Sequence, residues 1–204
     1  MNRSRAPALV ILAAGASTRL GTCKALVQLG RLSVLEHLLR AGACIDGAPP
    51  LVISGADHER IQSALPARAE LAFNTHWNMG RAGSVRCARE LRPGFDLCLA
   101  PVDVPLVPAS VFAALRASWL QHDGPPRGWL APCTRTREGI SYGHPVLVGR
   151  ELLAQLEPLG ADAPLSALRA LAEPLLAVEV ESAAIHDDLD TPSDLERLQH
   201  RTRI

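Results

Sequence analysis

The stretch from Leu9 to Lys24 constrains the fold more than any other part of this 204-residue chain. It begins inside an unbroken apolar run, residues 8–14, which predicts a strand buried on both faces of a sheet. The run ends at Gly15 in a loop of small residues that carries two cations, Arg19 and Lys24. Small residues let a backbone approach a ligand closely, and cations neutralise an anion. We therefore predict a polyphosphate site in this loop; the alternative is an ordinary glycine-rich turn with surface cations.

This loop differs from the two best-known phosphate-binding loops. A Walker A loop needs a second glycine before its Lys-Ser/Thr pair, and Leu20 stands at the position of that glycine. A dinucleotide-binding loop needs the spacing G-x-G-x-x-G, whereas Gly15 is followed by Ala16, Ser17 and Thr18. The sequence thus predicts neither a standard ATPase loop nor a standard NAD loop.

Composition narrows the partners of the chain. The 21 basic residues balance the 21 acidic ones, and aromatic residues make up only 3% of the chain. This composition argues against a nucleic-acid surface or a base-stacking platform. The five scattered cysteines form no C-x-x-C pair, which is typical of a reducing compartment. No stretch is long enough to span a membrane, so we expect a cytoplasmic protein without nucleic-acid or membrane partners.

The N-terminus imitates a signal peptide, because Arg3 and Arg5 precede an apolar run that ends in small residues. The run is short, however, and cleavage there would destroy the loop after Gly15. We interpret it as the first strand, with secretion as the minor alternative.

Apolar periodicity and capping residues predict alternating strands and helices. Asp57 is expected to cap one helix, and the capping boxes Ser33–Glu36 and Thr191–Asp194 to begin two others. Strands are expected at residues 8–14, 51–54, 71–73, 95–102, 129–133, 144–148 and 175–180. Helices are expected at residues 33–43, 57–65, 84–91, 108–121 and 151–156, within 162–171, and after residue 191. The loop 74–84 and a polar, mobile segment at 135–143 lie between them.

This alternation predicts an α/β fold with a mainly parallel sheet covered on both faces, in a single domain over residues 1–204. Ligands of such sheets bind beyond the carboxyl ends of the strands. Gly15, Asn74, Asp103 and Asp190 all follow strand-like runs. We therefore expect these residues to gather along one edge.

Two acidic positions are candidate ligands for a metal. Asp103 ends an apolar strand, where an ionised carboxylate is costly unless it is paired or bound to a metal, and hard oxygens suit Mg²⁺. The alternative is a turn aspartate. The acidic cluster at residues 187–190 offers a second carboxylate, although acidic residues before the helix that Thr191 caps are favourable anyway.

The loop from Asn74 to Ser84 has amide, hydroxyl and indole groups that suit a base and a ribose; the alternative is a surface loop with Trp77 packed on the core. We expect a structural role for His144, because the sequence supplies no partner for it. No Ser-His-Asp or Cys-His arrangement stands out, which leaves positioning and charge neutralisation around phosphates as the predicted chemistry.

Taken together, these motifs resemble the MobA-like nucleotidyltransferases, and most closely their molybdenum cofactor cytidylyltransferase branch. The resemblance covers nearly the whole chain. Its matching motifs are, in order, Leu12-Ala-Ala-Gly15-x-Ser17-x-Arg19-x-Gly21-x-x-Lys24, Asn74-x-x-Trp77-x-x-Gly80 with Ser84, Asp103-Val-Pro105, Gly143-His-Pro-Val-Leu147, and Asp188-Leu-Asp190-Thr-Pro-Ser-Asp194.

The resemblance implies a Rossmann-like nucleotidyltransferase fold, with a mainly parallel, mixed sheet and helices on both faces. It also implies a reaction in which a substrate phosphate attacks the α-phosphate of an NTP and releases pyrophosphate. The implied acceptor is the molybdopterin cofactor, and a client molybdoenzyme is a further partner. The Ala-Ala-Gly form of the first loop favours CTP over GTP.

The resemblance also implies roles for single residues. The catalytic residues would be Arg19 and Lys24, which neutralise the phosphates and the leaving pyrophosphate, and Asp103. Mg²⁺ would bind Asp103 together with Asp190, with Asp188 as the alternative second ligand. The nucleotide would contact Arg19 and Lys24, the backbone of Leu12, Ala13, Ala14 and Gly15, and, in the loop after residue 73, Asn74, Gly80 and Ser84.

The sequence departs from the family pattern at three places, of which the last concerns the acceptor side. Val104 stands where this branch often has Gln, Arg81 stands where Met is usual, and residues 160–165 lack the family's Gly-Ala-Arg stretch. Two alternatives therefore stay open: a nucleotidyltransferase for another phosphorylated metabolite such as a sugar phosphate, and a non-catalytic protein that binds and delivers NTP or cofactor.

Overall fold

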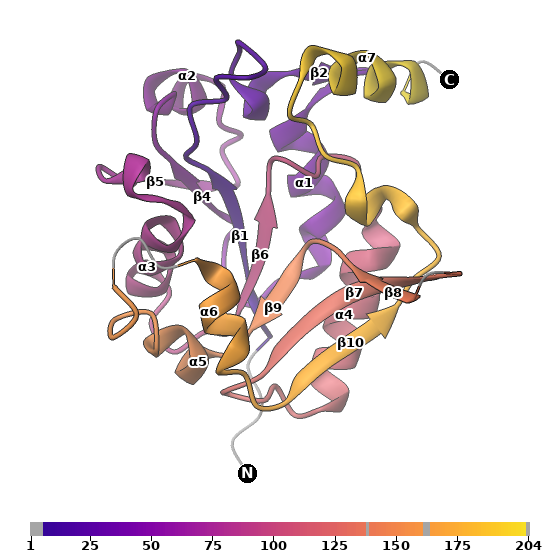
Figure 1. The fold of residues 1–204 in the computed structure, drawn as a ribbon. Coiled ribbons are helices and arrows are strands. Elements are labelled where there is room, and N and C mark those ends of the chain that lie inside the picture. Colours follow the sequence, from indigo (N-terminus) through magenta and orange to yellow (C-terminus); the bar gives the residue numbers. More distant parts are fainter. Residues whose placement is uncertain (1–5, 138, 161–163, 203–204) are drawn as a thin grey trace.

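The computed structural model describes residues 6–137, 139–160 and 164–202, and alternates strands with helices (Figure 1). The strands are β1 (Ala8–Ala13), β2 (Gln28–Leu29), β3 (Leu32–Ser33), β4 (Leu51–Ser54), β5 (Glu70–Phe73), β6 (Leu97–Pro101), β7 (Trp129–Thr136), β8 (Gly139–Tyr142), β9 (Val146–Val148) and β10 (Leu175–Glu179). The α-helices are α1 (Val34–Ala41), α2 (His58–Ala64), α3 (Arg81–Leu91), α4 (Ala109–Gln121), α5 (Arg150–Ala154), α6 (Leu165–Ala170) and α7 (Pro192–Arg201). Short 3₁₀ helices are η1 (Lys24–Leu26), η2 (Gly42–Cys44), η3 (Trp77–Met79) and η4 (Ala183–His186).

One eight-stranded sheet forms the centre of the fold, in the order β10-β7-β9-β6-β1-β4-β5, with β8 paired to β7. β1 is parallel to both of its neighbours, β4 and β6, and Val10 is in register with Leu51 on one side and Leu99 on the other. β9 is antiparallel to β6 and to β7, and β8 is antiparallel to β7. The sheet is therefore mixed and mainly parallel, which confirms the expected fold class.

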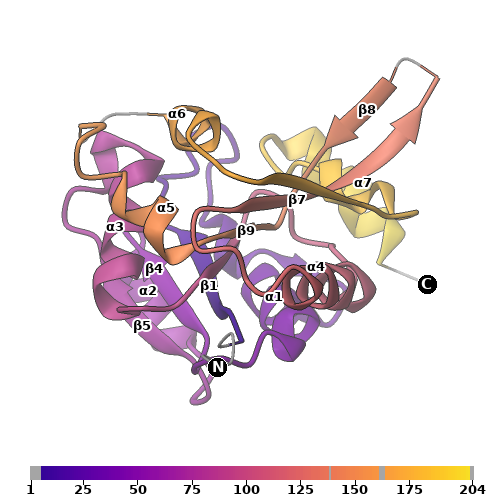
Figure 2. The same cartoon turned by 90° about the horizontal axis from the view of Figure 1, so that it is seen from below.

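Side chains on the two faces of β1 pack into two separate apolar clusters, because successive side chains along a strand point to opposite faces. Leu9 and Ile11 belong to a cluster that includes residues of α1, α4 and α7. Val10 and Leu12 belong to a second cluster, with residues of α3, α5 and α6. Figure 2 shows α1 and α4 on one side of the sheet and α5 and α6 on the other. Helices on both faces explain why every residue of β1 is buried.

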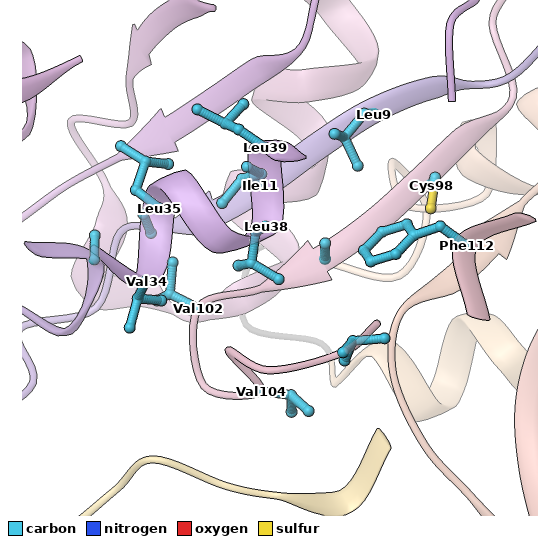
Figure 3. Packing of buried hydrophobic residues seen from close by; sticks show 14 of the residues in the cluster. Leu9, Ile11, Val34, Leu35, Leu38, Leu39, Cys98, Val102, Val104 and Phe112 are labelled. Carbon is cyan, nitrogen blue, oxygen red and sulfur yellow. The ribbon is translucent and has the colours of Figure 1, made fainter. Parts of the chain in front are cut away.

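The first cluster is built mainly from aliphatic side chains and includes the rings of Phe112 and Trp119. Figure 3 shows Phe112 with some of the aliphatic members of this cluster. Leu38 of α1, Leu9 of β1 and Phe112 of α4 are all 1% exposed or less. Gly42, at the end of α1, lies against this cluster, since a Cβ there would approach a Leu9 methyl to 2.7 Å. Close packing at this point brings the end of α1 against β1 and α4.

Most predicted elements are confirmed to within a few residues, and both capping boxes form as expected. In each, the hydroxyl of Ser33 or Thr191 accepts from the backbone N–H three residues later. Asp57 is different: it precedes α2, but its carboxylate accepts from Arg60 and makes no cap hydrogen bond. The prediction of a side-chain cap at Asp57 is therefore wrong, because the nearby guanidinium competes for the carboxylate.

Two further expectations are corrected by the structure. α3 begins at Arg81 rather than at Ser84, because Gly80 adopts a φ of +112° and turns the chain into the helix without a polar cap. The segment 135–143 was expected to be mobile, but in its described residues β7 continues to Thr136 and β8 pairs back onto it. The β2–β3 hairpin was not predicted, because its strands are only two residues each.

Arg3, Arg5 and Asp162 lie outside the described residues, and with them the signal-like terminus and the expected start of the helix within 162–171. Of the helices in the described ranges, none combines the length and the apolar character that crossing a bilayer requires.

Candidate functional site

Five charged side chains meet at one edge of the sheet. The ammonium of Lys24 donates to Oδ1 of Asp103 at 2.9 Å and to Oδ1 of Asp190 at 2.5 Å. Arg19 donates to the other oxygen of Asp190, and Arg81 to the other oxygen of Asp103, each at 2.8 Å. Three cations thus surround two carboxylates. Of the predicted site residues, the structure brings four together in this cluster: Arg19, Lys24, Asp103 and Asp190.

The glycine loop, residues 14–24, is shaped by its own backbone. The carbonyl of Ser17 accepts from the amides of Leu20 and Gly21, and Ser17 itself has a φ of +52°. Its hydroxyl accepts from the backbone N–H of Lys24 at 3.3 Å. These bonds hold the loop in a tight turn, and Lys24 as a whole is only 8% exposed.

Asp103 and Asp190 are 87 residues apart in the chain but are joined through the backbone. β6 ends at Pro101, and the carbonyl of Asp103 then accepts from the N–H of Leu189 at 2.7 Å. This bond attaches the aspartate loop, residues 187–190, to the end of β6. Asp190 itself follows η4 and a loop rather than a strand, which corrects the expectation that it ends a strand.

The capping box of α7 fixes the other side of the aspartate loop. Asp194 accepts from the N–H groups of both Asp190 and Thr191. These bonds and the Thr191 hydroxyl lower the pKa of Asp194 to about 2, with the hydroxyl as the largest cause. The carboxylate of Asp190 is therefore held on a short, doubly anchored segment that faces Lys24.

The pKa values of the two candidate second ligands are shifted in opposite directions. The hydrogen bond from Lys24 lowers the pKa of Asp190. Burial raises the pKa of Asp188, and repulsion from Asp190 and Asp103 adds to this effect. Asp190, and not Asp188, shares the Lys24 ammonium with Asp103, so the geometry favours Asp190 as the partner of Asp103.

A cavity of about 320 Å³, here the first cavity, opens beside this cluster. Gly15 lines it, and a Cβ built on Gly15 would meet nothing within 4 Å, so the glycine leaves room for a ligand rather than for protein packing. Of the predicted nucleotide and metal residues, those that line the first cavity are Leu12, Ala14, Gly15, Lys24, Gly80, Ser84 and Asp103. Those that do not line it are Ala13, Arg19, Asn74 and Asp190.

The Asn74 side chain makes hydrogen bonds within its own loop and to α3. Its amide nitrogen donates to the Ser84 hydroxyl at 3.1 Å, and its amide oxygen accepts from the backbone N–H of His76 at 3.0 Å. The side chain is buried, at 6% exposed, and ties the loop after β5 to α3. Trp77 from the same loop lines the first cavity and belongs to neither apolar cluster, so its position fits the base-contact interpretation better than the core-packing one.

The donor set at the cluster fits a hard divalent cation. Oxygens of Asp103 and Asp190 already converge on one positive charge, the Lys24 ammonium. Across the described part of the chain, no group of three or more His, Cys, Asp or Glu side chains forms a complete cage. Two carboxylates suit Mg²⁺, which is usually held by one or two carboxylates, waters and substrate phosphates.

A second cavity of about 250 Å³ adjoins the first, and the two share Leu12, Arg81 and Pro101 as lining residues. Tyr142 and Arg169 line the second cavity, with the guanidinium 4.9 Å from the ring centroid. Sequence reasoning missed both residues. The one available signal was the position of Tyr142, the chain's single tyrosine, immediately before the Gly143-His-Pro motif.

His144 also lines the second cavity, although the sequence predicted a purely structural role. Its backbone N–H donates to Ile185, whereas its buried Nδ1 has no hydrogen-bond partner within the described residues. Burial, helped by the positive charge of Arg81, lowers the pKa of His144 to about 4. The ring is therefore neutral near pH 7.

Comparison with known proteins identifies a family whose sequence model matches this chain. The model of the MobA-like NTP transferase domain matches residues 9–178. A curated relative, the bifunctional protein GlmU of Bradyrhizobium sp. (strain ORS 278), is 33% identical over 157 residues, which cover 74% of this chain and 34% of that protein. The chain therefore spans about a third of the length of this curated relative.

Solved structures share the fold. The molybdopterin-guanine dinucleotide biosynthesis protein A of Archaeoglobus fulgidus superposes with a TM-score of 0.69 at 18% identity, covering 95% of this chain and 97% of that one. Rv0371c of Mycobacterium tuberculosis, in a structure that is a complex with manganese, superposes with a TM-score of 0.72 at 21% identity over 95% and 97% of the two chains. At these identities the likeness is one of fold.

Proposed function

Because the chain belongs to the MobA-like NTP transferase family, we propose that it transfers the nucleoside monophosphate of an NTP to a phosphate group of an acceptor. The single observation that supports this most strongly is the placement of Lys24 between the carboxylates of Asp103 and Asp190 beside the first cavity. A glycine loop, buried cation and paired carboxylates at one sheet edge are the components that phosphoryl-type transfer needs.

In the proposed reaction, an oxygen of the acceptor phosphate attacks the α-phosphorus of the NTP. The bond from that phosphorus to the bridging oxygen of the β-phosphate breaks, and pyrophosphate leaves with the electron pair. Negative charge builds up on the leaving group, and Arg19 and Lys24 neutralise it. Gly15 and its neighbours hold the nucleotide through backbone N–H groups, which approach closely because no side chain stands in the way.

Mg²⁺, held by Asp103 and Asp190, would supply a positive charge that neutralises phosphate oxygens and orients them. This role has a consequence for the chain's own residues. The same two carboxylates hold Lys24 in the structure, so cation binding would release the ammonium from them. Lys24 would then face the phosphates of the nucleotide.

We further propose CTP as the donor and the molybdopterin cofactor as the acceptor. The Ala-Ala-Gly form of the glycine loop supports CTP over GTP. An acceptor that combines a flat heterocycle with a phosphate is compatible with the second cavity, which has Trp129 and Tyr142 as aromatic lining and Arg169 as a cation. The product would be passed to a client molybdoenzyme.

A second candidate is a nucleotidyltransferase that acts on another phosphorylated metabolite, such as a sugar phosphate. Two observations favour it. The curated relative described above is called bifunctional protein GlmU, a name that mentions no molybdenum cofactor. In addition, the sequence lacks the Gly-Ala-Arg stretch at residues 160–165, on the acceptor side.

The test is a pyrophosphate-release assay with each of four NTPs and Mg²⁺, alone, with molybdopterin and with glucose 1-phosphate. We expect release with CTP plus molybdopterin. Asp103→Ala should reduce the rate at least about a hundredfold, because transition-state charge is no longer balanced. The matched control is Asp46→Ala, since Asp46 is an aspartate paired with Arg116 that lines neither cavity.

Other outcomes would change the proposed acceptor, the proposed activity or the role of Asp103. Turnover only with glucose 1-phosphate would replace molybdopterin by the second candidate. Tight NTP binding without turnover of any acceptor would support a non-catalytic delivery protein. Equal rates for Asp103→Ala and the unmodified protein would contradict the role of Asp103.

A further inference from the structure

Arg81 contacts the charged cluster but has no role in the reaction proposed above. It is the first residue of α3, its side chain is 46% exposed, and its guanidinium donates to Oδ2 of Asp103. Of the three residues that line both cavities, Leu12 and Pro101 are apolar and Arg81 alone is charged. The guanidinium of Arg81 therefore lies where the two cavities adjoin.

The contact between Arg81 and Asp103 is weakly held. Asp103 also accepts from Lys24, so its carboxylate has two cationic partners in the structure. An ion pair with a half-exposed arginine contributes little, because water screens it and a long side chain must be ordered. A divalent cation at Asp103 carries twice the charge of a guanidinium. Its binding would therefore displace Arg81 at small cost.

A released guanidinium at this junction is suited to one kind of ligand. Its planar fork of N–H groups binds two oxygens of a phosphate at once, which an ammonium cannot do. The first cavity already has Lys24 for the donor phosphates, whereas Arg169 in the second cavity is stacked on Tyr142. Arg81 is thus the cation that lies where the second cavity meets the first.

We propose that Arg81 binds the phosphate of the acceptor, and that it becomes available when a divalent cation takes its place at Asp103. This inference rests on the proposed function, because it identifies the second cavity as the acceptor side. It makes acceptor binding depend on the cation, and it assigns the substrate class as phosphate monoesters. Arg81 would orient the attacking oxygen rather than take part in proton transfer.

The test measures binding rather than turnover. Phenyl phosphate, a monoester with a flat ring, is titrated into the protein by calorimetry with and without Mg²⁺. We expect the unmodified protein to bind it at least about tenfold more tightly with Mg²⁺. Arg81→Met, which keeps a long apolar stem, should lose about tenfold or more in affinity with Mg²⁺ present. Arg81→Lys should recover part of this loss.

Asp103→Asn gives the sharper prediction. It removes the negative partner, so Arg81 is free without any cation. Phenyl phosphate should then bind without Mg²⁺ to within about threefold of the unmodified protein with Mg²⁺, and Mg²⁺ should add little. The matched control is Arg89→Met, on the same helix, because Arg89 pairs with Glu157 and lines neither cavity.

Several results would overturn the inference. These are unchanged affinity in Arg81→Met, equal affinity of the unmodified protein with and without Mg²⁺, and no binding at millimolar concentrations. A loss confined to Arg169→Met would assign the phosphate to Arg169 instead. Titration of CTP separates this inference from the proposed function. A protein that binds no NTP but shows the Arg81 effect disproves only the function, and a loss of CTP affinity alone in Arg81→Met disproves only the inference.

Discussion

Replacing Lys24 by Met removes the charge that holds two carboxylates together. The side chain is 10% exposed, and those of Asp103 and Asp190 are 30% and 28% exposed. A well-shielded hydrogen bond to a charged group contributes about 1.5–3 kcal/mol, and the partial exposure of both acids reduces this contribution. We expect a loss of about 2 kcal/mol in the free energy of unfolding, because two acids are left close together with fewer partners.

For a chain of this size, such a loss lowers the melting temperature by about 4–8 °C. Millimolar Mg²⁺ should restore at least half of it in Lys24→Met, because a divalent cation takes over the two acids. The same Mg²⁺ should raise the melting temperature of the unmodified protein less, since there it competes with the ammonium. Thermal unfolding followed by circular dichroism measures both effects.

The matched control is Arg135→Met, which breaks a pair whose side chains are 66% and 56% exposed. Such a pair is screened by water, so its loss should lower the melting temperature by less than about 2 °C. A melting temperature of Lys24→Met within about 1 °C of the unmodified protein would refute the assignment of Lys24 as the counter-ion. Equal Mg²⁺ responses of the two proteins would refute the competition between cation and ammonium.

Three further predictions concern stability. Phe112→Ala empties a site that is 0% exposed and should cost about 3–5 kcal/mol in urea unfolding, with an unchanged denaturant slope. Gly80→Ala meets no neighbour within 4 Å but forces alanine to a φ of +112°, so it should cost about 1 kcal/mol or more through strain alone; a neutral result would show that α3 begins differently. Asp194 has a pKa of about 2 against an ordinary value of 3.8, so it stabilises the folded state above that ordinary value and loses its contribution as the pH falls from 3.8 to about 2. Asp194→Asn should therefore lower the urea midpoint at pH 6 and flatten its decline over that window, and a decline as steep as that of the unmodified protein would contradict the capping role.

The parts of the fold that the sequence predicted are those set by local signals. The apolar run of β1, and the capping boxes at Ser33 and Thr191, depend on residues within a few positions of each other. The convergence of Lys24 and Asp103 was predictable for a related reason, whereas Asp190, which follows η4 and a loop, was identified by its family motif alone. Parallel strands bring their carboxyl ends to one edge, and the family motifs identified which residues lie there.

Other features depend on contacts that no local pattern encodes. The hydrogen bonds of the Asn74 side chain with His76 and Ser84 were not predicted. The sequence identified Arg81 only as a departure from the family pattern, because its proposed role depends on its position between two cavities. Tyr142 reaches the second cavity through a hairpin whose polar residues suggested mobility.

The position of Asp190 has a consequence for how the protein is made. The acid belongs to a segment synthesised after every strand of the sheet, yet it closes a cluster begun by the loop that follows the very first strand. A nascent chain on the ribosome can assemble β1, β4 and β6 well before that acid emerges. The cluster of cations and carboxylates is therefore complete only after the last strand of the sheet, β10, and the aspartate loop that follows it have both been synthesised.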